Sequence, residues 1–330
     1  MATTLRQTIP PLDAGRTLHE WLVGRFRYLD AVGWHAQFAA GRITRNGALA
    51  TADDRLAAGD QIAFTPPPPP PDLPRPGRTI PVLFVDEDLV VVDKAPHLVV
   101  QHEAAFLQFT FLHDLAERFP TRHGQPRLEP VHRLDRETSG VLVLARSPQG
   151  SRGMQRQFEA HAVEKEYVAV ASGTIEADHH ELRGSIGLAA ASTVPTRRAV
   201  VPDGTPGARA AHTTLRVLQR LPAATLVALR PHTGRTHQLR VHLEQLGHPL
   251  VGDKLYGHDD ARHWRYLEHL KRDGDPRWPE ECAVGRQLLH ARRLTCTHPR
   301  TGAGLTFEAP WPADLEAFVR EHGGELPPSP

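Results

Sequence analysis

The chain has 330 residues, of which 40% are hydrophobic, which suffices for two domains or for one large domain with an appendage. Its net charge of +1 does not indicate a nucleic-acid-binding protein, and it shows neither a membrane-spanning apolar run nor a secretory signal core. We therefore expect no membrane partner. The two cysteines, Cys282 and Cys296, have neither zinc nor disulfide spacing, so we expect a protein of the reducing cytoplasm.

The first predicted module covers residues 10–65. Apolar residues at helical spacing predict a helix from Leu18 to Leu29, and a second helix is expected from Trp34 to Ala40 with Gly41 after its end. Asn46-Gly47 predicts a tight hairpin turn, and residues 61–64 are typical of a strand. The sequence therefore predicts a small α+β module.

A proline-rich linker follows at residues 66–78. It contains six consecutive prolines, from Pro66 to Pro71. Proline fixes φ and lacks a backbone donor, so this segment is expected to be a stiff polyproline II spacer. It separates the small module from a large domain at residues 79–325.

The large domain mixes strands and helices without regular alternation. Strands are predicted within 82–94 and at 141–145, 164–171, 213–218, 225–229 and 305–307. Helices are predicted at 110–119, 147–161, 236–247 and 312–321. This order favours an α+β or mixed α/β fold over a Rossmann fold or a barrel. Residues 258–288 are polar and are interpreted as an insertion without an assigned role.

The residues with the clearest chemistry lie in the segment from His132 to Gly140, directly before the strand at 141–145. Asp135 stands between Arg133 and Arg136. A cation within ~4–6 Å lowers the pKa of a carboxyl by about 1–3 units, which suits a nucleophile or an electrostatic stabiliser. A salt-bridged surface loop is the alternative interpretation of these residues.

The segment His-Arg-Leu-Asp-x-x-Thr-Ser-Gly resembles the catalytic motif of the RluA family of pseudouridine synthases at every defined position. Further segments resemble that family's motifs, at residues 90–94, 164–169, 234–242, 252–257 and 289–291. The resemblance covers most of the large domain. It implies an α+β pseudouridine synthase domain with a mixed, largely antiparallel sheet and flanking helices.

The resemblance implies an isomerase, an intramolecular transferase that needs neither cofactor nor metal. A uridine is flipped from its RNA into a pocket. Asp135 attacks carbon 6 of the base, or acts after the glycosidic bond breaks, and the base rejoins the ribose through carbon 5. Tyr167 lies against the uracil and aids deprotonation, and Arg235 pairs with Asp135. The resemblance also implies a set of substrate-binding residues in this domain, Arg133, Leu134, Lys165, His237 and Leu289.

The small module resembles the αL RNA-binding module named after a small-subunit ribosomal protein. The resemblance rests on residues 41–47 and 58–62, and it implies that Arg42 and Arg45 contact RNA phosphates. The expected partner is RNA, with ribosomal RNA favoured slightly over transfer RNA. No obligate protein partner is implied, and a monomer is the default. A small appendage that only packs on its neighbour is the alternative.

One segment departs from the family pattern. The family follows its early lysine with Pro-x-Gly, whereas this chain has Lys94-Ala95-Pro96-His97. Because glycine would permit a tight turn, this loop is expected to take another shape.

Two rival functions remain, and a metal site is a further alternative. The chain could be an RNA-binding protein with an inactive synthase domain, or a hydrolase that pairs Asp135 with a second carboxylate such as Glu137. A metal site at His232, His237, His242 and His248 is disfavoured, because His237 and His242 are not spaced to share a helix face and no cysteine or acidic ligand accompanies them.

Overall fold

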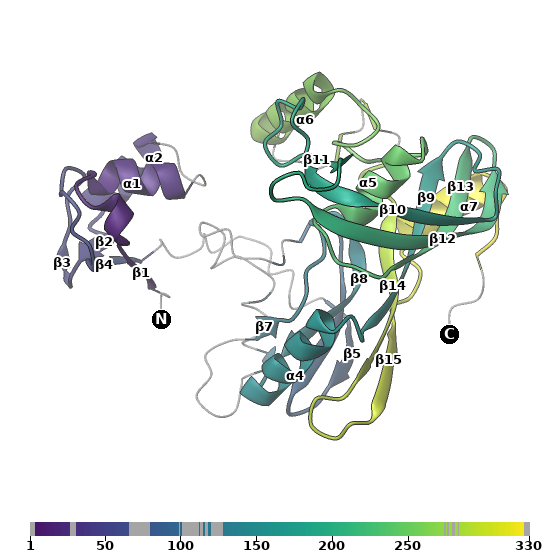
Figure 1. Cartoon of the computed structure of the whole chain (residues 1–330), viewed down its shortest axis with the longest axis horizontal. Helices are drawn as coiled ribbons and strands as arrows, with labels where there is room; N and C mark the ends of the chain where they lie inside the picture. The colour runs from purple at the N-terminus through teal and green to yellow at the C-terminus, as the bar shows by residue number, and fades with distance from the viewer. Residues whose placement is uncertain are drawn as a thin grey trace. The chain divides into compact units, whose positions relative to one another are not determined.

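The computed structural model describes residues 4–26, 31–65, 80–98, 100, 112, 115, 118–119, 128–273, 275, 277–278, 281–282 and 284–326. The chain divides into two compact units (Figure 1): a smaller unit of residues 1–78 with 101–118, and a larger unit of residues 79–100 with 119–330. The predicted linker at 66–78, and nearly all of the helix predicted at 110–119, lie outside the described residues.

The smaller unit packs two helices on a four-stranded sheet whose strand order is β1-β4-β2-β3. Its elements are β1 (Leu5–Thr8), the short helix η1 (Pro11–Asp13), α1 (Leu18–Arg25), α2 (Ala31–Ala39), β2 (Ile43–Arg45), β3 (Ala48–Leu49) and β4 (Gln61–Phe64). Thr17 and Glu20 form a capping box at the start of α1. The hairpin turn is confirmed, since Asn46 and Gly47 have φ of 51° and 87° between the antiparallel strands β2 and β3.

The larger unit is built on one mixed sheet. Its strands are β5 (Val82–Val85), β6 (Leu89–Lys94), β7 (Glu129–Pro130), β8 (Ser139–Ala145), β9 (Glu164–Ser172), β10 (His179–Leu188), β11 (Arg198–Val201), β12 (Arg209–Leu221), β13 (Ala224–Pro231), β14 (Leu289–Thr297) and β15 (Gly304–Glu308). The strand order is β11-β10-β12-β13-β9-β14-β8-β6-β5, with β15 beside β14 and β7 beside β8. Among the pairs of described strands only β8 and β14 run parallel, so the predicted largely antiparallel sheet is confirmed.

Four helices flank this sheet in the described residues: α4 (Pro148–Glu159), α5 (Gln238–Gln245), α6 (Asp260–Asp273) and α7 (Ala313–Glu321). Apolar side chains of β9, β12 and β13 pack against α5, and those of β6, β8 and β14 pack against α4. A third cluster joins β9 and β13 to α7. No described helix combines the length and the apolar character needed to cross a bilayer.

β10, β11 and α6 were not predicted from the sequence. β10 begins with exposed polar residues and buries mainly its second half, so it lacks the apolar run that marks β8. Half of the residues of α6 are charged, and its helical period was not recognised from the sequence. The cavity described next is surrounded by other elements: the loop before β8, the start of β9 and the start of α5.

Candidate active site

Asp135 lies in the loop that leads into β8. The amide of Thr138 donates to the carbonyl of Asp135 at 3.1 Å, which closes a tight turn. Gly140 follows with φ of 110°, and a Cβ there would stand 2.2 Å from the carbonyl oxygen of Ala291 on β14. Glycine at this position therefore lets the loop enter the sheet directly beside β14.

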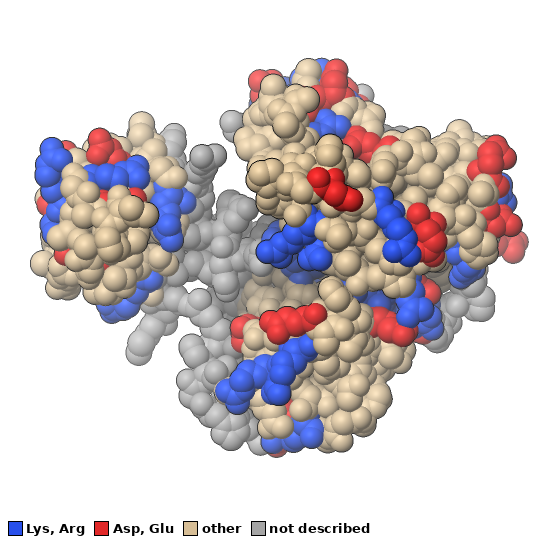
Figure 2. Space-filling view, viewed as in Figure 1, with Lys and Arg blue, Asp and Glu red and all other residues tan. Residues whose placement is uncertain are grey.

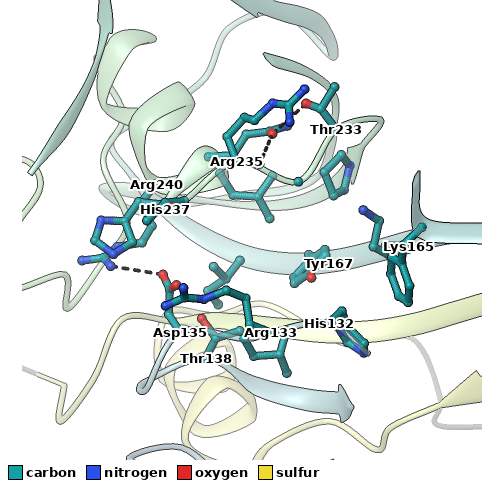
Figure 3. A pocket seen from close by; sticks show the side chains of 18 of the residues that line it. His132, Arg133, Asp135, Thr138, Lys165, Tyr167, Thr233, Arg235, His237 and Arg240 are labelled. Atoms are coloured by element: carbon teal, nitrogen blue, oxygen red, sulfur yellow. Dashed lines mark hydrogen bonds and ion pairs between the residues drawn. The ribbon is translucent and has the colours of Figure 1, made fainter. Parts of the chain in front are cut away.

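Arg240 holds the Asp135 carboxylate. Its Nη1 donates to Oδ2 of Asp135 at 3.1 Å (Figure 3). Its Nε and Nη2 donate to the two carboxylate oxygens of Asp253 at 2.7 and 2.8 Å. Burial alone would raise the pKa of Asp135, but the positive charges of His237, which is protonated only in acid, and of Arg240 hold this pKa below its usual value. Asp135 is therefore an ionised carboxylate in a fixed position.

The prediction that Arg235 pairs with Asp135 is wrong. Arg235 precedes α5, and its Nε donates to the carbonyl of Ala210 at 2.9 Å. Arg240 lies in the first turn of α5, which points its guanidinium at Asp135. The side-chain oxygen of Gln238 accepts the amide of Arg235 at 3.0 Å and so fixes the loop before the helix. Arg235 still lines the cavity.

Tyr167 lies on β9, paired with Leu229 of β13 and Ala291 of β14. Burial, followed by the negative charge of Asp135, raises the pKa of Tyr167. Its phenol is therefore protonated at neutral pH and presents a ring and a hydroxyl to the cavity rather than a phenolate.

A cavity of about 510 Å³ opens between these groups. In Figure 2 the surface of the larger unit is hollowed, with basic side chains beside the hollow. The sequence-predicted residues of the large domain all line the cavity, namely Asp135, Tyr167, Arg235, Arg133, Leu134, Lys165, His237 and Leu289. Asp135 and Arg240 lie at one end and Lys165 and His132 at the other, with Tyr167 between them (Figure 3).

The loop that departs from the family pattern lies against the loop that carries Asp135. Lys94 is fully buried, and its Nζ donates to the carbonyls of Ala95, Leu98 and Arg136 at 2.9, 3.1 and 3.1 Å. Burial lowers the pKa of Lys94 to about 7. His97 adopts the left-handed conformation that glycine favours, with φ of 66°. The expectation that this loop differs in shape from the family's loop stays a prediction.

The insertion at 258–288, which had no assigned role, contacts the loop that carries Asp135 through α6. The hydroxyl of Tyr266 accepts from Nη2 of Arg136 at 2.5 Å and donates to Oε1 of Glu137 at 3.3 Å. Nζ of Lys254 donates to Oε2 of Glu137 at 3.0 Å. Tyr266 is only 2% exposed, so α6 anchors both residues that follow Asp135.

These contacts weaken the hydrolase interpretation. Glu137 faces Lys254 and Tyr266 and does not line the cavity, so it does not form a carboxylate pair with Asp135 across a substrate. In the part of the chain that the structure describes, no group of three His, Cys, Asp or Glu side chains could hold a metal ion.

Arg42 and Arg45 lie in the smaller unit, at the start of its β2–β3 hairpin. Nη2 of Arg45 lies 2.7 Å from Oδ2 of Asp60, and Nη1 of Arg42 donates to Oε1 of Gln37 at 3.1 Å. Both side chains are partly exposed. Their predicted contact with RNA stays a prediction.

Comparisons with known proteins agree with this arrangement. The family described as RNA pseudouridylate synthase matches residues 88–245. A ribosomal large subunit pseudouridine synthase D of Nitrosomonas europaea is 33% identical over 322 residues, which cover 96% of this chain and 87% of the relative. A protein of the same name from Zymomonas mobilis is 35% identical over 260 residues, covering 75% of this chain and 76% of the relative.

A solved structure is also similar. Human RNA pseudouridylate synthase domain containing 4 has a TM-score of 0.58 and 26% sequence identity, and the match covers 75% of this chain and 95% of the human chain. The sequence comparisons and the fold comparison therefore both match this chain to RNA pseudouridine synthases.

Proposed function

Because this chain belongs to the RluA family of RNA pseudouridine synthases, isomerases that convert uridine to pseudouridine in RNA, we propose that it modifies ribosomal RNA with Asp135 as its nucleophile. The choice of ribosomal RNA is supported by the relatives, whose names specify the large ribosomal subunit. Transfer RNA is the substrate against which this choice is tested.

The reaction exchanges one bond of the ribose for another. The bond between carbon 1′ and nitrogen 1 breaks, a bond between carbon 1′ and carbon 5 forms, carbon 5 loses a proton and nitrogen 1 gains one. The substrate is neither oxidised nor reduced, so the proposed steps need only the side chains of the site and solvent. Asp135 supplies the nucleophile, either at carbon 6 or at carbon 1′.

The observation that carries this proposal is the bridge that Arg240 makes between Asp135 and the buried Asp253 at the cavity wall. A nucleophile must be ionised and correctly oriented, and a guanidinium fixed by a second carboxylate provides both. The partly buried phenol of Tyr167 offers a flat surface for a flipped base. An inactive binding domain would have no use for this costly buried arrangement.

RNA binding is proposed to be shared with the smaller unit. Arg42 and Arg45 would contact phosphates there, while Arg133 and Lys165 would contact the RNA around the flipped uridine. A cytoplasmic location follows from a ribosomal RNA substrate in relatives that are bacterial.

Mapping of pseudouridine tests the proposal. Ribosomal and transfer RNA from cells that lack this gene would be incubated with the purified protein, and pseudouridine would be located by carbodiimide labelling and primer extension. We expect new pseudouridine at defined positions of large-subunit RNA. New sites in transfer RNA alone would overturn the substrate, and no new site in either RNA would favour the binding protein with an inactive domain.

A further inference from the structure

His237 stands where the backbone turns into α5. It adopts the left-handed conformation, with φ of 57°, and its ring lines the cavity beside Asp135. The ring meets the edge of Tyr256 with a centroid distance of 5.6 Å and an interplanar angle of 86°. Nδ1 of His237 lies 2.8 Å from the hydroxyl oxygen of Tyr256.

The hydrogen bonds of Tyr256 decide which nitrogen of His237 carries the proton. The Tyr256 hydroxyl oxygen accepts the amide of Arg198 at 3.1 Å, and Tyr256 has no exposed surface. If Nδ1 of His237 also donated, the phenol hydrogen would be buried without an acceptor, which costs about 1–3 kcal/mol. The phenol therefore donates to Nδ1, and the proton of the neutral ring is on Nε2.

The surroundings also keep this ring uncharged. Burial, followed by the charge of Arg240, lowers the pKa of His237 to about 4. The guanidinium of Arg240 stands 4.7 Å from the ring centroid of Tyr256, close to the same hydrogen bond. At neutral pH the imidazole is therefore a neutral donor at Nε2.

Nε2 is left for a ligand. Among the described residues it has no hydrogen-bond partner, although the ring belongs to the cavity wall. Nε2–H can donate but cannot accept, which excludes His237 as the base that removes the proton from carbon 5. A donor next to the nucleophile suits an oxygen of the substrate.

On the basis of the proposed function, we infer that His237 donates its Nε2–H to an oxygen of the flipped uridine, beside the carbon that Asp135 attacks, and that Tyr256 holds His237 in this tautomer. His237 is then a substrate-contacting residue, and Tyr256 is a positioning residue that acts through it.

The tautomer can be measured without any assay of activity. Long-range nitrogen–proton correlation spectra of the whole protein, labelled with ¹⁵N-histidine, identify the His237 signals by their loss in His237→Gln. We expect the Nε2–H pattern at pH 7, and a mixture of both tautomers in Tyr256→Phe. An Nδ1–H pattern or a protonated ring in the wild-type protein would overturn the inference.

Two substitutions of His237 test the role of the donor. Glutamine places an amide N–H near the position of Nε2, whereas asparagine places its amide near Nδ1. We expect kcat/KM to fall about thirtyfold in His237→Asn and only about threefold in His237→Gln, with the affinity for RNA nearly unchanged in both. Asparagine tolerates the left-handed backbone better than glutamine, so backbone strain cannot produce this order.

Equal losses in the two variants would contradict the donor role. The proposed function is tested separately, because it fails if the wild-type protein forms no pseudouridine in any RNA. The tautomer that the nitrogen spectra measure would be unaffected by that result.

Discussion

Charged side chains are held differently in the two units. In the larger unit, Arg240 has a side chain only 10% exposed and bridges Asp135 and the buried Asp253. In the smaller unit, Arg45 is 27% exposed and makes one ion pair with Asp60, beside a core of apolar and aromatic residues.

The difference shows what each arrangement can do. A buried, fully paired cation cannot move toward solvent phosphates, but it controls the ionisation and orientation of its carboxylate partner. A partly exposed arginine at a hairpin gains little from its own ion pair and can exchange it for an RNA phosphate. Chemistry is therefore expected from the first arrangement and salt-dependent affinity from the second.

The largest effect is expected from Arg240→Gln. This change leaves the buried Asp253 and the partly buried Asp135 without their cation, which should cost about 3–5 kcal/mol of unfolding free energy and at least about a hundredfold in kcat/KM. Urea unfolding and single-turnover kinetics measure the two losses.

The same variant makes a prediction about pH. In the wild-type protein the pKa of Asp135 lies below its usual value, so activity should persist as the pH falls and be lost only when that lowered pKa is reached. In Arg240→Gln burial is less opposed, so the acid limb of kcat/KM should move to higher pH. Arg235→Gln, in the loop before α5, is the matched control, and an equal shift there would refute the assignment of the ion pair to Arg240.

The arginine that pairs with Asp135 is a feature that the sequence alone did not predict correctly. The motif around Asp135 and the other segments that resemble the family predicted a set of residues that line one cavity, among them Asp135 and Tyr167. They did not distinguish Arg235 from Arg240. The direction of each side chain depends on where α5 begins, and that boundary is the least certain part of a sequence-based prediction.

The role of the insertion was equally hidden. Tyr266 reaches Arg136 and Glu137 from a segment more than a hundred residues away in the chain, and a polar helix such as α6 gives no periodic signal of such a contact. The strand order of the sheet was also beyond the sequence, because β14 pairs with both β8 and β9.

A smaller effect is expected from Tyr266→Phe. Loss of one hydroxyl that bonds two charged side chains should lower the unfolding free energy by about 1.5–3 kcal/mol and kcat/KM by several-fold, with RNA affinity unchanged. Trp264→Phe is the control on the same helix, since its indole bonds Thr193 instead of the catalytic loop. If both variants lost the same activity, α6 would act through general stability and not through the loop.

The smallest effect on turnover is expected from changes in the smaller unit. Arg42→Ala combined with Arg45→Ala should weaken RNA binding about tenfold at low salt. The slope of the logarithm of the binding constant against the logarithm of the salt concentration should become shallower by about 1–2. The rate at which uridine is converted to pseudouridine in RNA that is already bound should hardly change. Filter binding across a salt series measures both quantities.

The control is Arg272→Ala combined with Arg320→Ala, which removes two exposed arginines of the larger unit. An unchanged affinity and slope in the Arg42 and Arg45 variant, or an equal loss in the control, would refute the RNA-binding assignment of the smaller unit.

The most direct test of the central claim compares the wild-type protein with Asp135→Asn on ribosomal RNA that carries tritium at carbon 5 of uridine. Release of tritium and binding of RNA would be measured in the same samples. We predict that the wild-type protein releases tritium and that the variant binds the RNA equally well but releases tritium at least about 10³-fold more slowly. Release by the variant at the wild-type rate would contradict the assignment of Asp135 as the nucleophile.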